Sequence, residues 1–222
     1  MPEGKLLIGH RRYSSWSMRG WLAVRLARLD VEIEVARFVR PGPTPIIAQT
    51  SPNGLVPYLE HRGARVWESL SVCEYCAEFE PSLWPADRAA RAQGRSIAAE
   101  MLAGFRGLRQ NMWMNLGRDY SGLGRVPEAL ADIARIEALW ADTRQRFGAG
   151  GPFLFGAALT AADVMYAPVV TRFLTWGPEI TDASRAYCDA VRAHPLVAEW
   201  YDDAAREPAD WLIADYEATP AR

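Results

Sequence analysis

The sequence of 222 residues has few of the features that mark secreted, metal-binding or nucleic-acid-binding proteins. It has 3 cysteines, too few for the disulfide framework of a small secreted domain. Its histidines (His10, His61 and His194) lie far apart and away from the cysteines, so no metal site is expected. Lys5 is the only lysine among 25 basic residues, and the scattered arginines form no basic patch for nucleic acid.

The chain also lacks a long apolar run. No window approaches about 18 consecutive apolar residues, so no transmembrane helix is predicted. Residues 1–12 contain no apolar stretch long enough for a signal peptide. The formal net charge of −2 gives no attraction to an anionic membrane surface. We therefore expect a cytoplasmic protein that binds neither nucleic acid nor membrane.

The N-terminal part has the pattern of an α/β fold. The segment 31–39 (VEIEVARFV) alternates apolar and polar residues, which is the period of a strand. A proline-rich loop over residues 41–57 separates it from the next strand. The predicted elements, in order, are strand 5–9, helix 16–29, strand 31–39, a short helical turn near 44–49, strand 55–60, strand 64–67 and helix 69–80.

The C-terminal part has only helical periodicity. Residues 79–87 contain two prolines and are predicted to be a linker. The sequence therefore predicts two domains, an α/β domain over residues 1–82 and an all-helical domain over residues 87–222. The predicted helices of the second domain are 87–116, 128–147, 161–174, 183–193 and 196–207.

The first candidate motif is residues 13–19 (YSSWSMR), between the first strand and the first helix. Ser14 or Ser15 is a suitable N-cap, which alone would explain a serine there. The turn would also place free backbone N–H groups and the positive end of a helix dipole beside a hydroxyl. A ligand thiol held there would have its pKa lowered from about 8.5, because the serine would donate a hydrogen bond to the thiolate.

The second motif is residues 51–57 (SPNGLVP), at the start of strand 55–60. An ordinary turn would explain these residues. A cis Val56–Pro57 bond would instead turn the N–H and C=O of Val56 away from the sheet, where a peptide ligand could pair with them as an added strand.

The third motif is residues 67–75 (WESLSVCEY). Ser71 and Glu74 fit a capping box at a helix start. Alternatively, a helix that begins at Ser69 would be an anion site for a carboxylate, and Glu68 beside it would bind an ammonium. Glu68 and Ser69 together would then hold an α-amino-acid head group.

In this order and in this frame of strands and helices, the three motifs resemble the glutathione transferase superfamily over nearly the whole chain. The resemblance implies an α/β thioredoxin-like N-terminal domain plus an all-α helical C-terminal domain. A fourth match is residues 156–163 (GAALTAAD), similar to the family's capping box before the core helix. There Thr160 caps the helix and Asp163 reaches back, which we interpret as stabilising rather than catalytic.

The serine turn is most similar to that of the zeta class, in which S-S-C is followed by an arginine three residues later. The two serines and Arg19 match, but Trp16 stands where the zeta class has cysteine, and bacterial members with S-S-W-S are more similar still. This difference weakens any transfer of maleylacetoacetate isomerase activity. Cys73 and Cys76 lie inside the third predicted helix, so we interpret this pair as structural rather than redox-active.

The resemblance implies glutathione as co-substrate and assigns it a thiol site. Ser14 is expected to donate to the glutathione thiolate, with Ser15 as the close alternative. Val56, followed by Pro57, is expected to bind the backbone of the cysteinyl residue.

The two ends of glutathione are assigned in the same way. Glu68 and Ser69 are expected to hold the γ-glutamyl head, and Arg40 is a partner for the glycine carboxylate. No metal is implied.

The pocket for the second substrate is expected between the domains, against the first helix of the C-terminal part. An aromatic and methionine stripe at helical spacing can equally belong to the core. Arg109 and Asn111 are a polar pair that could bind a carboxylate of that substrate. The candidates are Phe105, Leu108, Arg109, Asn111, Met112 and Trp113.

The prediction is a cytoplasmic glutathione transferase, by resemblance a homodimer with a role in detoxification. It would stabilise the glutathione thiolate for attack on a small electrophile, by conjugation or by isomerisation. The alternatives are a zeta-like maleylacetoacetate isomerase, a non-catalytic binder of glutathione or apolar ligands, and a scaffold for partner binding.

Overall fold

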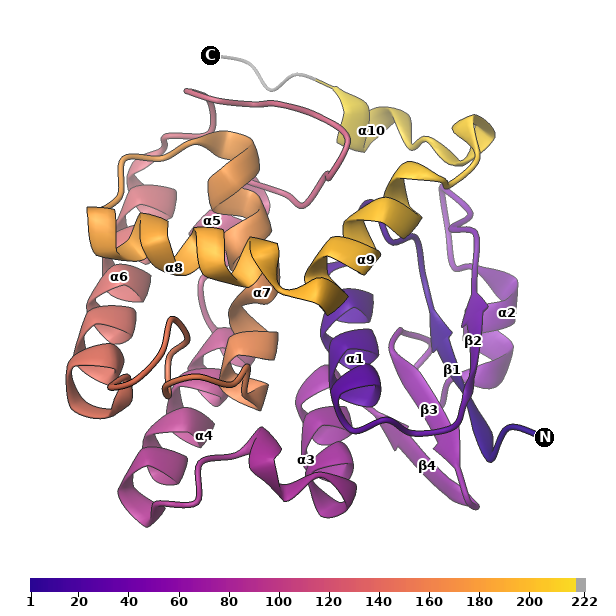
Figure 1. Ribbon diagram of the computed structural model, residues 1–222. Coiled ribbons are helices and arrows are strands. Elements are labelled where there is room, and N and C mark those ends of the chain that lie inside the picture. Colours follow the sequence, from indigo (N-terminus) through magenta and orange to yellow (C-terminus); the bar gives the residue numbers. More distant parts are fainter. Residues whose placement is uncertain (219–222) are drawn as a thin grey trace.

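A four-stranded sheet forms one side of the protein in the computed structural model, which describes residues 1–218 (Figure 1). The strand order is β2-β1-β3-β4. β1 pairs in parallel with β2 and antiparallel with β3, which in turn pairs antiparallel with β4. The strands are β1 (Gly4–Ile8), β2 (Glu32–Val35), β3 (Tyr58–His61) and β4 (Ala64–Trp67).

Both faces of this sheet are covered, because apolar residues of β1 and β3 point alternately to the two sides. Leu6, Ile8 and Leu59 belong to the main core, and Leu7 and Tyr58 to a smaller cluster on the other face. Figure 1 shows α1 (Ser15–Leu26) and α3 (Ser69–Phe79) on the first face and α2 (Pro45–Thr50) on the second.

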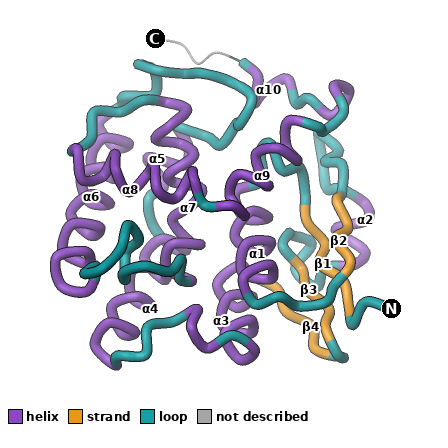
Figure 2. The backbone as a smooth tube through the Cα atoms, viewed as in Figure 1, coloured by secondary structure: helices purple, strands orange, loops and turns teal. Residues whose placement is uncertain are grey.

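The rest of the chain is helical, as predicted, and Figure 2 shows that all the strands lie in the other half. Helix α7 is its centre, because 14 of its residues are buried. The elements are η1 (Pro81–Leu83), α4 (Arg88–Ala103), α5 (Arg106–Asn111), α6 (Pro127–Phe147), α7 (Ala161–Trp176), α8 (Asp182–Ala193), α9 (Pro195–Ala205), η2 (Ala209–Trp211) and α10 (Ala214–Glu217).

Two sequence predictions are corrected by this structure. The helix predicted over 87–116 is broken after Ala103, because Phe105 takes a left-handed conformation (φ 56°) that turns its ring into the core. The strand predicted over 55–60 begins only at Tyr58. Pro57 has no N–H to donate to the sheet, and the chain from 51 to 57 is a loop.

The main hydrophobic core runs through both halves of the molecule. Helix α1 packs against α3 and β1 on the sheet side and against α7 and α9 on the other side. The buried Nε of Arg19 donates to the carbonyl of Met165 at 2.8 Å, which joins α1 to α7. Among residues 1–218, no helix combines the length and apolarity that a membrane span needs.

The predicted capping box at the start of α7 is confirmed. The buried Asp163 carboxylate accepts hydrogen bonds from Leu154 N (3.0 Å), Thr160 N (2.8 Å), Thr160 Oγ1 (2.7 Å) and Tyr187 Oη (3.0 Å). Asp163 therefore connects the preceding loop, the first turn of α7 and helix α8.

Replacing Asp163 with alanine is expected to lower the free energy of unfolding by about 4 kcal/mol, because several buried donors lose their acceptor at once. Thr160→Ala is expected to cost about 1 kcal/mol. Asp142→Asn, on the exposed face of α6, is the control and should change stability by less than about 0.5 kcal/mol. Urea denaturation measures all three. A cost for Asp163→Ala near that of the control would refute this account.

Candidate functional site

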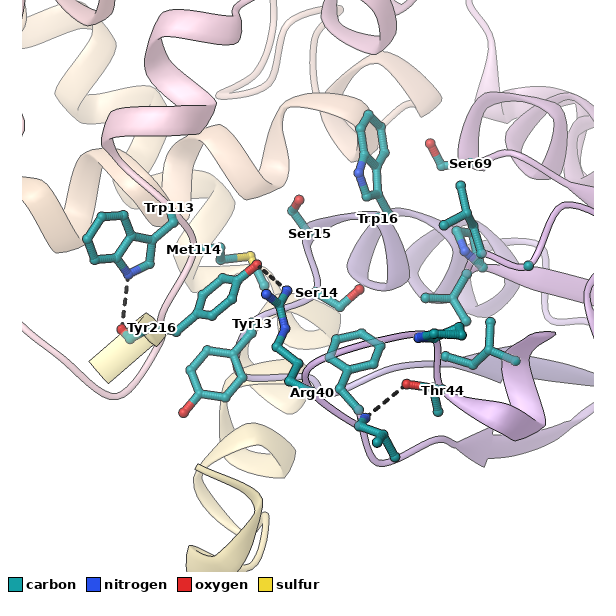
Figure 3. Close-up of a pocket in the computed structure, with 18 of the residues that line it drawn as sticks. Tyr13, Ser14, Ser15, Trp16, Arg40, Thr44, Ser69, Trp113, Met114 and Tyr216 are labelled. Atoms are coloured by element: carbon teal, nitrogen blue, oxygen red, sulfur yellow. Dashed lines mark hydrogen bonds between the residues drawn. The ribbon is translucent and has the colours of Figure 1, made fainter. Parts of the chain in front are cut away.

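A cavity of about 810 Å³ opens at the boundary between the α/β half and the helical half (Figure 3). The α/β half lines it with residues 13–16, 38–44, 53–57 and 68–69 and with Ile47. The helical half contributes Arg109, Trp113, Met114, Arg172 and Tyr216. All three sequence motifs therefore meet in one cavity.

The N-terminus of α1 forms one wall of the cavity. Ser14 is the N-cap, and its Oγ accepts from the Ser17 backbone N–H at 3.3 Å and donates to Ser17 Oγ at 2.7 Å. Ser17 Oγ also accepts from Gly9 N at 2.9 Å, so α1 is fastened to the end of β1. The first N–H groups of the helix and its dipole favour an anion at this point.

The two serines face different surroundings. In the view of Figure 3 the Ser14 hydroxyl points toward the part of the cavity between Ser69 and Thr44. The Ser15 hydroxyl points elsewhere, and its Oγ accepts from Nη2 of Arg172 at 3.4 Å. Ser14 is therefore the serine directed toward the predicted glutathione contacts.

The Val56–Pro57 bond is cis, as the motif predicted. Val56 lies outside the strands, and no hydrogen bond between residues 1–218 uses its backbone N–H or C=O. Asn53 fixes the loop, because its Oδ1 accepts from Leu55 N at 3.0 Å. Gly20 allows α1 to pack closely against Pro57, because a Cβ at residue 20 would lie only 2.6 Å from Cβ of Pro57.

Helix α3 begins at Ser69, which is the helix start that the second interpretation of its motif requires. Ser71 lies inside the helix, so the capping box with Glu74 is wrong. Glu68 has φ 68°, a conformation that non-glycine residues rarely adopt, and its Oε1 accepts from Asn53 Nδ2 at 3.1 Å. Among residues 1–218, the Ser69 hydroxyl donates a single hydrogen bond, to Met165 Sδ at 3.8 Å.

Arg40 lines the same cavity and is held by the end of the chain. Its Nη2 donates to Tyr216 Oη at 3.2 Å, and its Cζ lies 5.1 Å from the centroid of that ring. Trp113 Nε1 donates to the Tyr216 carbonyl at 3.0 Å. Figure 3 shows Arg40, Tyr216 and Trp113 in a row on one side of the cavity.

Of the residues predicted for the second substrate, the structure brings only Arg109 and Trp113 to the cavity. Met112 is fully buried, and Phe105 is 6% exposed in the core. Asn111 donates to the Gly107 carbonyl at 2.8 Å within its own helix. The break before α5 rotates these side chains away from the positions that a continuous helix would have given them.

The sequence did not reveal four further lining residues of the cavity. Arg172 lies on α7 and Met114 follows α5, while Thr44 precedes α2 and Tyr216 lies on α10. Neither local periodicity nor a motif marks them, because each reaches the cavity through packing with distant parts of the chain.

The cysteine pair of α3 is not part of the cavity. Cys73 and Cys76 are both fully buried, and burial raises the pKa of the Cys73 thiol to about 12. A thiol with so high a pKa is protonated at neutral pH, which agrees with the structural interpretation.

His10 fixes the loop that leads into α1. Its buried ring stacks with Phe38 and Trp211, with centroids 4.8 and 5.0 Å away. Nε2 accepts from Phe38 N at 2.9 Å, and the His10 carbonyl accepts from Ser14 N at 2.9 Å. An accepting ring nitrogen requires the neutral ring. Burial, together with the charge of Arg37, lowers the pKa of His10 to about 4.

Acidification from about pH 6.5 toward pH 4 is expected to destabilise the protein through His10. Between these pH values the unfolded chain binds a proton that the folded ring does not, so the free energy of unfolding decreases as the pH is lowered. His10→Gln, which keeps an acceptor, should remove about 2 kcal/mol of this pH dependence, allowing for partial screening. Urea denaturation at about pH 7 and pH 4.5 measures it. Equal pH slopes in the two proteins would refute the assignment.

A thioredoxin-like half, a helical half and a cavity between them are the architecture of glutathione transferases. Two family models match the sequence: "Glutathione S-transferase, N-terminal domain" over residues 13–78 and "Glutathione S-transferase, C-terminal domain" over residues 119–203. The chain belongs to the glutathione transferase superfamily.

Curated relatives include glutathione S-transferases L3 and L1 of Arabidopsis thaliana. L3 is 29% identical over 154 residues, or 68% of this chain and 57% of that protein. L1 is 26% identical over 190 residues, or 84% of this chain and 72% of that protein. The match therefore spans little more than half the length of L3.

Solved structures of the superfamily share the fold. A glutathione transferase homologue from Burkholderia, with bound glutathione, superposes with a TM-score of 0.68 at 20% identity, covering 92% of this chain and 99% of that one. TDR1 of Leishmania, a trimeric glutathione transferase, gives 0.70 at 18% identity, covering 93% of this chain and 47% of that one. At these identities the likeness concerns the fold.

Proposed function

We propose that this protein is a glutathione transferase that binds glutathione in the boundary cavity and presents its thiolate to a small electrophile. The observation that carries the proposal is the convergence of the Ser14 turn, the free backbone of Val56 and the Glu68–Ser69 helix start on one cavity. These are an anion site, a peptide-pairing edge and an amino-acid site, and glutathione has the complementary groups in one molecule.

In this proposal the sulfur lies at the N-terminus of α1, where the Ser14 hydroxyl donates to it instead of to Ser17 Oγ. The Ser17 hydroxyl then donates to Ser14 Oγ, so the pair of serines stays hydrogen-bonded. Val56 pairs with the cysteinyl backbone, beside Pro57. Glu68 binds the γ-glutamyl ammonium, and the Ser69 N–H and hydroxyl bind the carboxylate beside it. The protein lowers the thiol pKa and positions the thiolate, which is the first step shared by conjugation and isomerisation.

Arg40 is the proposed partner of the glycine carboxylate at the other end. Its guanidinium lies within the cavity and is held by the hydroxyl of Tyr216, with no carboxylate of residues 1–218 within 4.0 Å. A cytoplasmic location and a homodimer are further proposals, supported by the family resemblance. Light scattering of the purified chain tests the dimer.

Ser14→Ala is expected to lower kcat by about 100-fold or more while the KM for glutathione changes by less than about threefold, because the lost hydrogen bond acts on the thiolate. The kinetic pKa of bound glutathione should also rise toward about 8.5. Steady-state kinetics across pH measure both. Ser15→Ala is the matched variant and should have the smaller effect. Equal losses in kcat and affinity would contradict this role of Ser14.

Glu68→Gln is expected to weaken glutathione binding about tenfold or more with little change in kcat, because the ion pair to the ammonium is made equally before and during reaction. Calorimetry measures the affinity.

Glu78→Gln, on the exposed side of the same helix, is the control. Glutathione lacking its α-amino group should bind wild type and Glu68→Gln alike, and a persisting difference would contradict the assignment. Absence of binding to wild type at millimolar glutathione would refute the function itself.

A further inference from the structure

Three arginines meet beneath and beside the cavity without an acidic partner. They come from three helices: Arg19 from α1, Arg109 from α5 and Arg172 from α7. Arg19 is fully buried and Arg172 is 4% exposed. No carboxylate of residues 1–218 lies within 4.0 Å of any of the three guanidinium groups. Buried charges in proteins are normally paired, so this cluster is unusual.

Trp16 contacts two of the three arginines. The Cζ atoms of Arg19 and Arg109 lie 4.5 and 5.3 Å from the centroid of its indole, within cation–π distance. Trp16 itself lines the cavity, and Arg19 does not. Arg19 is therefore covered, whereas Arg109 and Arg172 both line the cavity, with Arg172 beside Ser15.

The two arginines that line the cavity, Arg109 and Arg172, have N–H groups that no described residue accepts from. Arg172 donates from Nη1 to the Pro168 carbonyl at 2.9 Å and from Nη2 to Ser15 Oγ at 3.4 Å, and its buried Nε has no partner among the described residues. Arg109 makes one long bond, from Nη1 to the Leu102 carbonyl at 3.4 Å. A planar anion can use the remaining N–H groups.

The pKa values of the buried arginines also indicate an unsatisfied positive charge. Burial, and next the positive charge of Arg109, lower the pKa of Arg172 to about 10. Burial likewise lowers the pKa of Arg19, with the charges of Arg172 and Arg109 adding to the effect. The guanidinium groups remain charged at neutral pH, so the lowered values express an unfavourable free energy that a bound anion would relieve.

Glutathione does not supply this anion in the proposed binding mode. Its carboxylates lie at Ser69 and at Arg40, and its thiolate lies at the N-terminus of α1. We propose that Arg109 and Arg172 bind a carboxylate of the electrophilic substrate, an inference that rests on the proposed function. The substrate class is an electrophile whose carboxylate is close to the carbon under attack, because Arg172 touches Ser15 beside the thiolate site.

An unsaturated keto acid such as trans-benzoylacrylate has this form. The thiolate electron pair forms the S–C bond at the carbon that bears the carboxylate. The π pair shifts through the adjacent carbon to the ketone oxygen, giving an enolate, and water protonates that adjacent carbon. The proton lost when the thiol ionised is thereby regained from solvent, and no other reactant is needed.

The test compares trans-benzoylacrylate with its methyl ester, which keeps the reactive carbons and removes the negative charge. Wild type is expected to favour the acid over the ester by at least tenfold in kcat/KM, corrected for the uncatalysed rates. Arg172→Gln and the half-buried Arg109→Gln should each reduce this ratio about tenfold or more. Arg106→Gln removes an exposed charge from the same helix as Arg109 and should leave the ratio unchanged.

Binding is measured separately with benzoylpropionate, the unreactive saturated analogue, by quenching of tryptophan fluorescence. Binding to wild type that is lost in both variants, without turnover of either substrate, would support the anion site and refute the proposed function. Turnover with an acid-to-ester ratio that neither variant changes would overturn the anion site and leave the function standing. An equal slowing of acid and ester, with a raised kinetic pKa, would overturn the proposal by making Arg172 a thiolate-positioning residue.

Discussion

The burial of helix α1 on both of its sides is the constraint from which the site follows. Nine of its 12 residues are buried, against the sheet and α3 on one side and against α7 and α9 on the other. Its N-terminus therefore cannot move without separating the two halves of the molecule. Two hydrogen bonds hold the first turns of α1. Arg19 donates to the Met165 carbonyl of α7, and Ser17 accepts from Gly9 N at the end of β1. The chemistry proposed for Ser14 requires such a fixed position.

Local motifs are the part of the site that the sequence predicted. The serine turn, the Val56–Pro57 bond and the start of α3 at Ser69 depend on residues adjacent in the chain, whose conformations follow from capping and proline chemistry. The alternation of strands and helices followed by helices alone predicted the fold class in the same way. The predicted ends of strands and helices were less accurate than the fold class, as at Pro57, because the pairing partners decide where a strand begins.

The substrate side of the cavity could be predicted only in small part. Spacing along one helix placed Phe105, Asn111 and Met112 with Arg109, but the left-handed turn at Phe105 and the end of α5 at Asn111 separate them. Arg172 lies more than sixty residues after Arg109 in the sequence, on a helix that is almost wholly buried. Periodicity marks α7 as a core helix and does not tell which buried polar residue faces a cavity.

Trp16 acquires a physical role from its neighbours. In the zeta class a cysteine occupies this position, and here an indole contacts two guanidinium groups. An aromatic face partly compensates the charge of arginines that have no carboxylate. The indole at this position thus lies in a strongly cationic wall of the cavity, beside the proposed thiolate site.

The contacts of residues 207–217 with the loop before α1 affect the order in which the protein folds during synthesis. The Glu207 carboxylate accepts from the backbone N–H groups of Arg11 and Arg12, and Glu217 accepts from Tyr13 Oη. Tyr216 lines the cavity. The loop before α1 is synthesised well before residues 207–217, which contain its partners. During translation the α/β half can therefore collapse early, but this wall of the cavity is complete only after residues 207–217 have also left the ribosome.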